Sequence, residues 1–185
     1  MKKIITSVIV AISLISVSSV SKAQDGRFSI GAEIGLPMGD FADFAGLGIG
    51  GSIRYEAPMG DNIGLTGTAG YISFGGKTIS GVKLESSYLI PLQAGLKYYF
   101  DEQQSGFYAQ AELGFHMYKS TEVTIDLVNG TFTTKDKTKA AFSYAPEVGY
   151  HMESLDLGLR YQMVSTEGNT TSYLGIRIAY VLGGN

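Results

Sequence analysis

Apolar and polar residues alternate strictly along most of the chain. In the segment 88–100, every even position is apolar or aromatic, from Tyr88 to Phe100, whereas the odd positions include Gln93 and Lys97. A period of two residues is typical of β-strands, whose successive side chains point to opposite faces. The alternation predicts eight strands, over 27–36, 47–57, 63–74, 88–100, 107–118, 140–152, 155–163 and 174–182.

The predicted connections between these strands alternate in length. An even number of strands joined by long and short connections in turn is typical of an up-and-down β-barrel, either in a membrane or as a soluble ligand-binding barrel. The long connections cover 37–46, 75–87, 119–138 and 165–171, and the short ones cover 58–62, 101–106 and 153–154.

Two prolines, Pro91 and Pro146, lie inside predicted strands. Each lacks the amide hydrogen that a strand donates to its neighbour, and a closed barrel has no edge at which that loss is harmless. We therefore expect a local β-bulge at both positions.

The composition of the two strand faces distinguishes a membrane barrel from a soluble one. A soluble barrel buries its apolar face, whereas a membrane barrel turns that face to lipid and lines its lumen with polar side chains. Here the apolar face carries no charge, and most strand glycines lie on the polar face, where a narrow lumen has little room. The sequence therefore predicts an all-β, transmembrane, eight-stranded antiparallel up-and-down β-barrel. Its lumen is expected to hold a polar network of Glu33, Arg54, Glu56, Lys97, Glu112, Glu147, Asp156, Arg160 and Arg177.

Aromatic residues of the apolar face gather near the two ends of the strands. Two such aromatic girdles are typical of the two interfaces of a membrane. The girdle near the short turns consists of Phe28, Tyr55, Tyr98, Phe100, Phe107, Tyr150 and Tyr180. The girdle toward the long loops consists of Tyr71, Tyr88, Phe142, Tyr144 and Tyr161.

The first 23 residues predict a cleaved signal peptide. Lys2 and Lys3 precede an apolar stretch over 4–15, and small residues occupy positions 21 and 23. The apolar stretch is too short for a transmembrane helix. Cleavage after Ala23 would leave residues 24–185 as one barrel domain.

The charge and the cysteine content exclude several functions. Of the 14 basic residues, 3 lie in the predicted signal peptide, so 11 remain against 17 acidic residues and the mature charge is −6. An acidic chain without a basic run is not expected to bind nucleic acid. The chain has no cysteine, which excludes disulfides, thiol chemistry and a lipid-modified N-terminal cysteine.

The mature chain resembles the small eight-stranded outer-membrane barrels of the OmpA transmembrane domain and OmpX over essentially its whole length. Its last strand resembles the insertion signal of that class at Tyr173, Gly175, Ile178 and Tyr180. The chain departs from the family by continuing over 181–185 instead of ending on an aromatic residue. The resemblance implies residence in the cell outer membrane of a Gram-negative envelope, with outer-membrane lipid and the barrel-assembly machinery as partners.

The chain offers few residues for catalysis or metal binding. His116 and His151 are its only histidines, and the alternation places both on the lumen face near opposite ends of the barrel. Two distant imidazoles do not form a metal site. Lipid-modifying barrels, which this chain resembles in architecture, need a lipid-facing histidine or a roomy apolar lumen. We therefore expect no catalytic residue, no metal, no cofactor and no enzymatic activity.

The connection 119–138 predicts a hairpin that projects beyond the membrane. The outward phase of the preceding strand continues into this connection, and Asn129-Gly130 is a strong two-residue turn signal. Pairing about that turn joins Val128 to Thr131 and Met117 to Phe142.

An exposed strand edge can accept a strand from a partner. We therefore expect an interaction edge at Val123, Ile125 and Leu127. The function that follows is a structural or adhesion-like surface role for a monomeric barrel, with an unidentified extracellular protein or surface ligand as partner. The alternative is a narrow porin-like channel for ions or small solutes.

Overall fold

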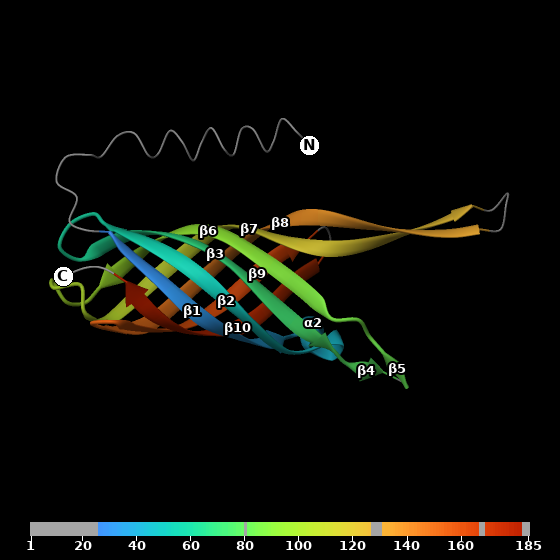
Figure 1. Ribbon diagram of the computed structural model, residues 1–185, viewed down its shortest axis with the longest axis horizontal. Helices are drawn as coiled ribbons and strands as arrows, with labels where there is room; N and C mark the ends of the chain where they lie inside the picture. The colour runs from blue at the N-terminus through green and yellow to red at the C-terminus, as the bar shows by residue number, and fades with distance from the viewer. Residues whose placement is uncertain (1–25, 80, 127–130, 167–168, 183–185) are drawn as a thin grey trace, which may run out of the picture.

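A computed structural model describes residues 26–79, 81–126, 131–166 and 169–182. Within these residues, eight long antiparallel strands close into a barrel, and strands adjacent in the chain are adjacent in the ring (Figure 1). They are β1 (Arg27–Met38), β2 (Ala45–Pro58), β3 (Ile63–Gly76), β6 (Ser87–Tyr99), β7 (Gly106–Asp126), β8 (Thr131–Met152), β9 (Leu155–Thr166) and β10 (Asn169–Leu182). The predicted fold class is confirmed. The predicted signal peptide lies outside the described residues, and its cleavage stays a prediction.

Two of the long connections contain small elements that the alternation did not predict. The short helix α2 (Asp40–Phe44) joins β1 to β2, and the two-residue strands β4 (Thr78–Ile79) and β5 (Val82–Lys83) pair between β3 and β6. All three lie at the same end of the barrel, which we call the outer mouth (Figure 1). No helix in the described part of the chain is long and apolar enough to cross a membrane.

The barrel is inside out relative to a soluble protein. Leu96 is 56 % exposed on the outer surface, whereas the adjacent Lys97 is 1 % exposed in the lumen. This alternation persists because the strands pair in registers that keep inward residues beside inward residues, as in the pair Glu33 and Arg177 of β1 and β10. The sequence pattern thus dictates both the strands and the side of the wall that each residue occupies.

Inward glycines make room for the large polar side chains of the lumen. Gly175 lies opposite Arg160 across the β9–β10 ladder, and a Cβ atom there would lie 2.9 Å from the Arg160 Cγ. A Cβ at Gly158 would lie 2.7 Å from the Glu147 Oε1. Both distances are below van der Waals contact, so a larger residue at either site would displace a charged side chain.

The expected bulges at Pro91 and Pro146 are wrong. Pro91 pairs in register with His116 of β7. On the other side of β6, toward β3, the described pairs are interrupted for two positions at Pro91 and then continue in the same register. Pro146 behaves in the same way between β7 and β9. Each proline therefore costs local hydrogen bonds without inserting an extra residue. The register shift in the described ladders lies in β2 instead, between Ala45 and Gly48.

The β7–β8 hairpin extends far beyond the rest of the barrel at the outer mouth (Figure 1). Its predicted register is wrong by two residues, because Met117 pairs with Ala140 and the last described pair is Asp126 with Thr131. A shift of two keeps every residue on its predicted face, so the alternation cannot distinguish the two registers. Residues 127–130, between the last described pair, lie outside the described residues.

Candidate functional site

An ion pair crosses the middle of the lumen. The Arg54 guanidinium of β2 donates two hydrogen bonds to the Glu147 carboxylate of β8, from Nη1 to Oε1 and from Nη2 to Oε2, each 2.9 Å long. Four strand steps separate β2 from β8 in either direction around the ring, so the pair spans the barrel's diameter. Arg54 Nη2 also lies 3.6 Å from the Glu112 Oε1 of β7.

A second group of charges surrounds Glu33 of β1. Its carboxylate accepts a 3.1 Å hydrogen bond from Arg160 Nη2 and a 2.6 Å hydrogen bond from the Ser52 hydroxyl. The Arg177 Nε lies 3.6 Å from the same carboxylate, and it donates to the Ser52 oxygen at 2.9 Å. Two cations therefore share one buried anion.

A third group lies toward the short turns and is centred on Lys97. Its ammonium donates to Asp156 Oδ2 at 2.6 Å and to Glu56 Oε2 at 3.3 Å, and it lies 3.9 Å from the centre of the Tyr108 ring. The Tyr108 hydroxyl lies 3.0 Å from carboxylate oxygens of both Glu147 and Asp156. Tyr108 thereby joins this group to the central ion pair.

The structure places all nine residues of the predicted lumen network inside the barrel, each at most 5 % exposed. Ion pairs and the Tyr108 bridge connect all nine into one network. Buried charges are tolerated when each has a partner of opposite sign and its hydrogen bonds are made. Each charge of the network therefore has a partner of opposite sign, while Glu112 Oε2 and Arg160 Nε and Nη1 are buried without a hydrogen bond to the described part of the chain.

The sequence reasoning missed Arg27 and Tyr99 at the end of the lumen near the short turns. The Tyr99 hydroxyl donates to Glu56 Oε1 at 2.7 Å, and Arg27 Nη1 donates to His151 Nε2 at 3.1 Å and to the Gln104 carbonyl oxygen at 3.2 Å. Arg27 stands at the first position of β1, where the alternation has just begun, so its inward phase was visible in the sequence.

An apolar cluster lies in the lumen toward the outer mouth, on the face of the strands that the alternation predicts to be polar. Phe41 of α2 packs edge-on against Phe74 with 5.0 Å between ring centres, and Phe74 packs against Tyr173 at 5.3 Å. Ile72 and Leu89 complete the buried part of this cluster together with Ala45. The inward phase of β3 already assigned Ile72 and Phe74 to this side of the wall.

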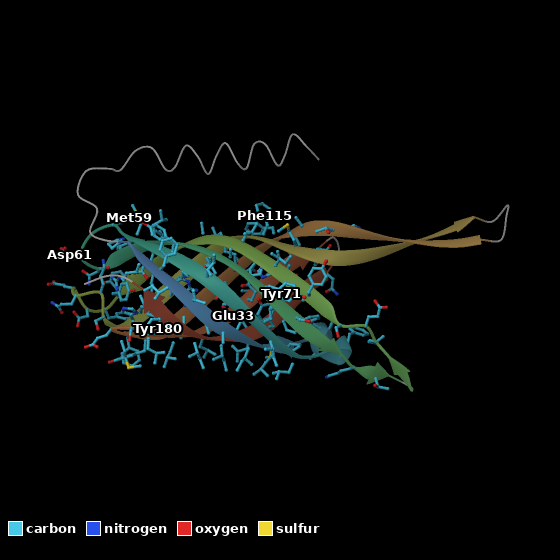
Figure 2. All side chains as sticks on the ribbon, in the orientation of Figure 1. Glu33, Met59, Asp61, Tyr71, Phe115 and Tyr180 are labelled. Carbon is cyan, nitrogen blue, oxygen red and sulfur yellow. The ribbon has the colours of Figure 1, made fainter. Side chains whose placement is uncertain are left out.

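The predicted girdles lie on the outer surface of the barrel. Eleven of the twelve residues have exposed side chains, and Tyr88 is half-buried, stacked on Tyr71 at 5.7 Å. Figure 2 shows Tyr180 near one end of the barrel and Tyr71 toward the other.

The residues of the predicted insertion signal divide between the two faces of β10. Tyr173 and Gly175 are buried in the lumen, whereas Ile178 and Tyr180 are exposed on the outer surface. Tyr173 therefore also belongs to the apolar cluster.

The two histidines lie in separate surroundings. The buried His116 ring lies near the apolar cluster, with Nε2 3.5 Å from the Tyr173 hydroxyl, whereas His151 Nδ1 lies 3.5 Å from Asp156 Oδ2. Within the described residues, no group of three His, Cys, Asp or Glu side chains could hold a metal ion. Of the predicted interaction edge, Val123 and Ile125 lie on β7, paired with Thr134 and Phe132, and Leu127 lies outside the described residues.

Comparison with known proteins shows which family model and which solved structures this barrel resembles. A family model described as outer membrane protein beta-barrel domain matches residues 7–181. The barrel is similar to Ail, the attachment invasion locus protein of Yersinia pestis, solved with the heparin analogue sucrose octasulfate. The identity is 13 %, the match covers 85 % of this chain and 97 % of that one, and the TM-score is 0.59. The N-terminal β-barrel domain of Pseudomonas aeruginosa OprF is similar at 12 % identity, with coverages of 87 % and 100 % and a TM-score of 0.56. A search of curated protein sequences finds no match.

Proposed function

Because the chain belongs to the outer membrane protein β-barrel family and is a transmembrane barrel of the outer membrane, we propose that it acts at the cell surface through its β7–β8 hairpin. The hairpin binds an extended segment of an extracellular protein, and the barrel is a monomeric, non-enzymatic anchor for it. Outer-membrane lipid surrounds the barrel, and the barrel-assembly machinery inserts it after signal-peptide cleavage.

The observation that carries this proposal is the free length of the hairpin. Pairing between β6 and β7 ends at Tyr118, and pairing between β8 and β9 begins at Phe142. The β7–β8 ladder nevertheless continues for eight more pairs, from Lys119–Thr138 to Asp126–Thr131. Among the described residues, the outer edges of both strands therefore have no neighbouring strand beyond these points.

Unpaired strand edges offer a row of backbone donors and acceptors to any extended peptide. Strand addition at such an edge takes most of its affinity from main-chain hydrogen bonds. A surface role of this kind agrees with the similar fold of Ail, whose name describes an attachment and invasion protein.

The lumen favours this role over the porin-like alternative. The Arg54–Glu147 pair crosses the barrel's diameter, and the apolar cluster lies in the lumen between that pair and the outer mouth. A solute would have to displace both. We therefore expect the mature protein to give no sustained conductance in planar bilayers, and a stable open channel would instead support the alternative.

Two single proline substitutions test the role of the hairpin edge. Successive residues of a strand direct their N–H groups to opposite sides of the strand. One of the substitutions Thr133→Pro and Thr134→Pro therefore removes a hydrogen bond to β7. The other removes only an N–H group on the unpaired outer edge of β8, and we call it the edge-donor variant. Amide exchange identifies the variant that keeps the hairpin. Binding of the refolded mature protein is then measured on a panel of immobilised extracellular-matrix and serum proteins.

We expect the edge-donor variant to keep its hairpin and lose binding to whichever protein of the panel the parent protein captures. A further variant that replaces residues 120–137 by Asn-Gly should keep the barrel and lose the same binding. If the edge-donor variant binds as well as the parent does, or the parent binds nothing in the panel, strand addition at this edge is wrong.

A further inference from the structure

The turn between β6 and β7 lies at the end of the lumen near the short turns, which we call the inner mouth. Gln104 of this turn is polar, yet it is only 7 % exposed. Its φ of +52° lies in the left-handed region, which residues other than glycine rarely adopt. The neighbouring Gln103 is exposed. The turn therefore keeps one of its two glutamines out of water, and it does so in an uncommon backbone conformation.

Contacts with two other parts of the ring hold Gln104 in this position. Its Nε2 donates to the Gly60 carbonyl oxygen, in the turn between β2 and β3, at 2.7 Å. Its Oε1 and its main-chain oxygen both accept from the guanidinium of Arg27, the main-chain oxygen at 3.2 Å. The side-chain amide and the main-chain carbonyl of Gln104 thus all have partners outside its own turn.

The contact between Arg27 and Gln104 crosses the inner mouth. Arg27 begins β1, and Gln104 precedes β7 by two residues. Four strand steps separate β1 from β7 in either direction around the ring, so the two strands stand opposite each other. Arg27 Nη1 also donates to His151 Nε2 of β8 at 3.1 Å. One guanidinium therefore links β1 to the β6–β7 turn and to β8 across the opening.

The hydrogen bonds within the turn do not involve the Gln104 side chain. The Gln104 amide donates to the Asp101 carbonyl oxygen at 3.1 Å. The Gln103 amide donates to Asp101 Oδ1 at 2.9 Å, and the Phe100 amide donates to the Phe107 carbonyl oxygen at 3.1 Å. Proteins open locally where few contacts must break. The contacts across the inner mouth can therefore be released while the turn and the β6–β7 ladder stay intact.

The charged network begins directly beneath this contact. The ring centre of the buried Tyr99 lies 5.6 Å from Arg27 Cζ, and its hydroxyl donates to Glu56. The short turns of outer-membrane barrels face the periplasm. We propose that Arg27 and Gln104 form a latch that closes the inner mouth and controls the access of water-soluble molecules from the periplasm to the charged network. The latch does not depend on the proposed surface role, because the hairpin lies at the opposite end of the barrel (Figure 1).

A cysteine introduced behind the latch tests this proposal, because the chain has no cysteine of its own. The buried Val181 of β10 pairs with Ser29, which lies two residues beyond Arg27 on the same face of β1. Val181→Cys thus places a thiol one layer deeper than Arg27. The refolded mature protein in detergent micelles is treated with a charged methanethiosulfonate reagent, and mass spectrometry follows the labelling rate. We expect this rate to rise about tenfold or more when Gln104→Ala is added, because the loss of hydrogen bonds raises the open fraction.

Two controls separate the latch from a general loosening of the barrel. Gln103→Ala is the matched control, because Gln103 stands in the same turn with an exposed side chain, and it should leave the rate unchanged. A second reporter, Ala141→Cys, is buried in the lumen toward the outer mouth, where Ala141 pairs with His116. Gln104→Ala should not change the labelling rate at this second reporter.

Several outcomes would overturn the latch. The first is an unchanged rate at the Val181→Cys reporter in Gln104→Ala, and the second is a thiol that reacts as fast in the folded parent as in the unfolded chain. Equal acceleration by Gln103→Ala, or at the Ala141→Cys reporter, would show general loosening and contradict a local closure. Arg27→Ala breaks the same contact from the opposite strand, so it must also accelerate labelling, and it takes the place of Gln104→Ala if that variant does not fold.

Discussion

Arg54 shows how one residue can organise the lumen. Its guanidinium donates to both oxygens of Glu147 on β8, to Gln110 of β7 at 3.2 Å and, from Nε, to Thr68 of β3 at 3.0 Å. Arginine suits this position because its planar guanidinium carries five donors in a fixed geometry. The side chain therefore links four strands of the ring.

Breaking the Arg54–Glu147 pair from one side should destabilise the barrel strongly. Arg54→Met leaves a buried carboxylate without its main partner, which we expect to cost about 3–5 kcal/mol of unfolding free energy. The double variant Arg54→Met with Glu147→Met should be more stable than the sum of the two single effects predicts. Reversible unfolding in lipid vesicles measures all three, and additive effects would show that the pair is not coupled.

Charge should be least tolerated in the middle of the lipid-facing surface. Leu92 is exposed on β6, midway along the strand between Tyr88 and Tyr98. Leu92→Arg should lower the unfolding free energy in vesicles by roughly 2–4 kcal/mol, because the cation meets the hydrocarbon core. Leu47→Arg, at the outer end of β2, should cost about 0–1 kcal/mol. A tolerated arginine at Leu92 would contradict the orientation of the wall.

The alternation predicts the face of a residue but not its partner. Glu33 and Arg177 are direct cross-strand neighbours, so the register brings them together. Arg54 and Glu147 meet only because the sheet closes and the two strands face each other across the ring. That proximity depends on the curvature of the whole barrel, which no local pattern encodes. The same holds for Phe41, which reaches the lumen from a connection.

At the level of secondary structure, the long connections were the hardest part to predict. Helix α2 has five residues, too few for a helical period to appear in the sequence, and β4 and β5 have two residues each. Gly39 before α2 has a φ of +55°, a conformation that glycine adopts without strain, so the helix begins at a position suited to a sharp turn.

Cysteine pairs test the register of the hairpin. Because the chain has no cysteine of its own, an introduced pair reports only on itself. We expect disulfides in at least one of the pairs 121 with 136 and 122 with 135, whose Cα atoms are cross-strand partners. In an antiparallel ladder, hydrogen-bonded and non-hydrogen-bonded pairs alternate, so one of these two neighbouring pairs is of each type. The non-hydrogen-bonded pair has the closer Cα atoms, and disulfide formation depends on that distance.

The matched controls join 121 with 138 and 122 with 137, the register that the Asn-Gly turn predicted. Preferential oxidation of these controls in the folded barrel would show that the turn at Asn129-Gly130 is right and that the register described above is wrong. Equal oxidation of both sets would indicate a hairpin that slides between registers.

As a whole molecule, the barrel exposes apolar side chains such as Ile49 and Phe107 at 65 % and 69 %. Such a surface is stable only against lipid or detergent. We expect residues 24–185 to remain folded only in amphiphile, and the folded form to migrate differently from the boiled form on a denaturing gel. A monodisperse folded preparation without amphiphile would contradict the membrane assignment.

The pairing of β1 with β10, the seam of the barrel, can form only after all the strands have been synthesised. Phe28 pairs with Leu182 across this seam, so the first and last strands of the ring come from opposite ends of the chain. Because the ribosome makes β10 after all the other strands, a partly synthesised or truncated chain has two open edges and cannot close. We expect closure to be late and slow, since it joins the residues most distant in sequence. Ring closure is thus a step that only a chain with all eight strands can complete.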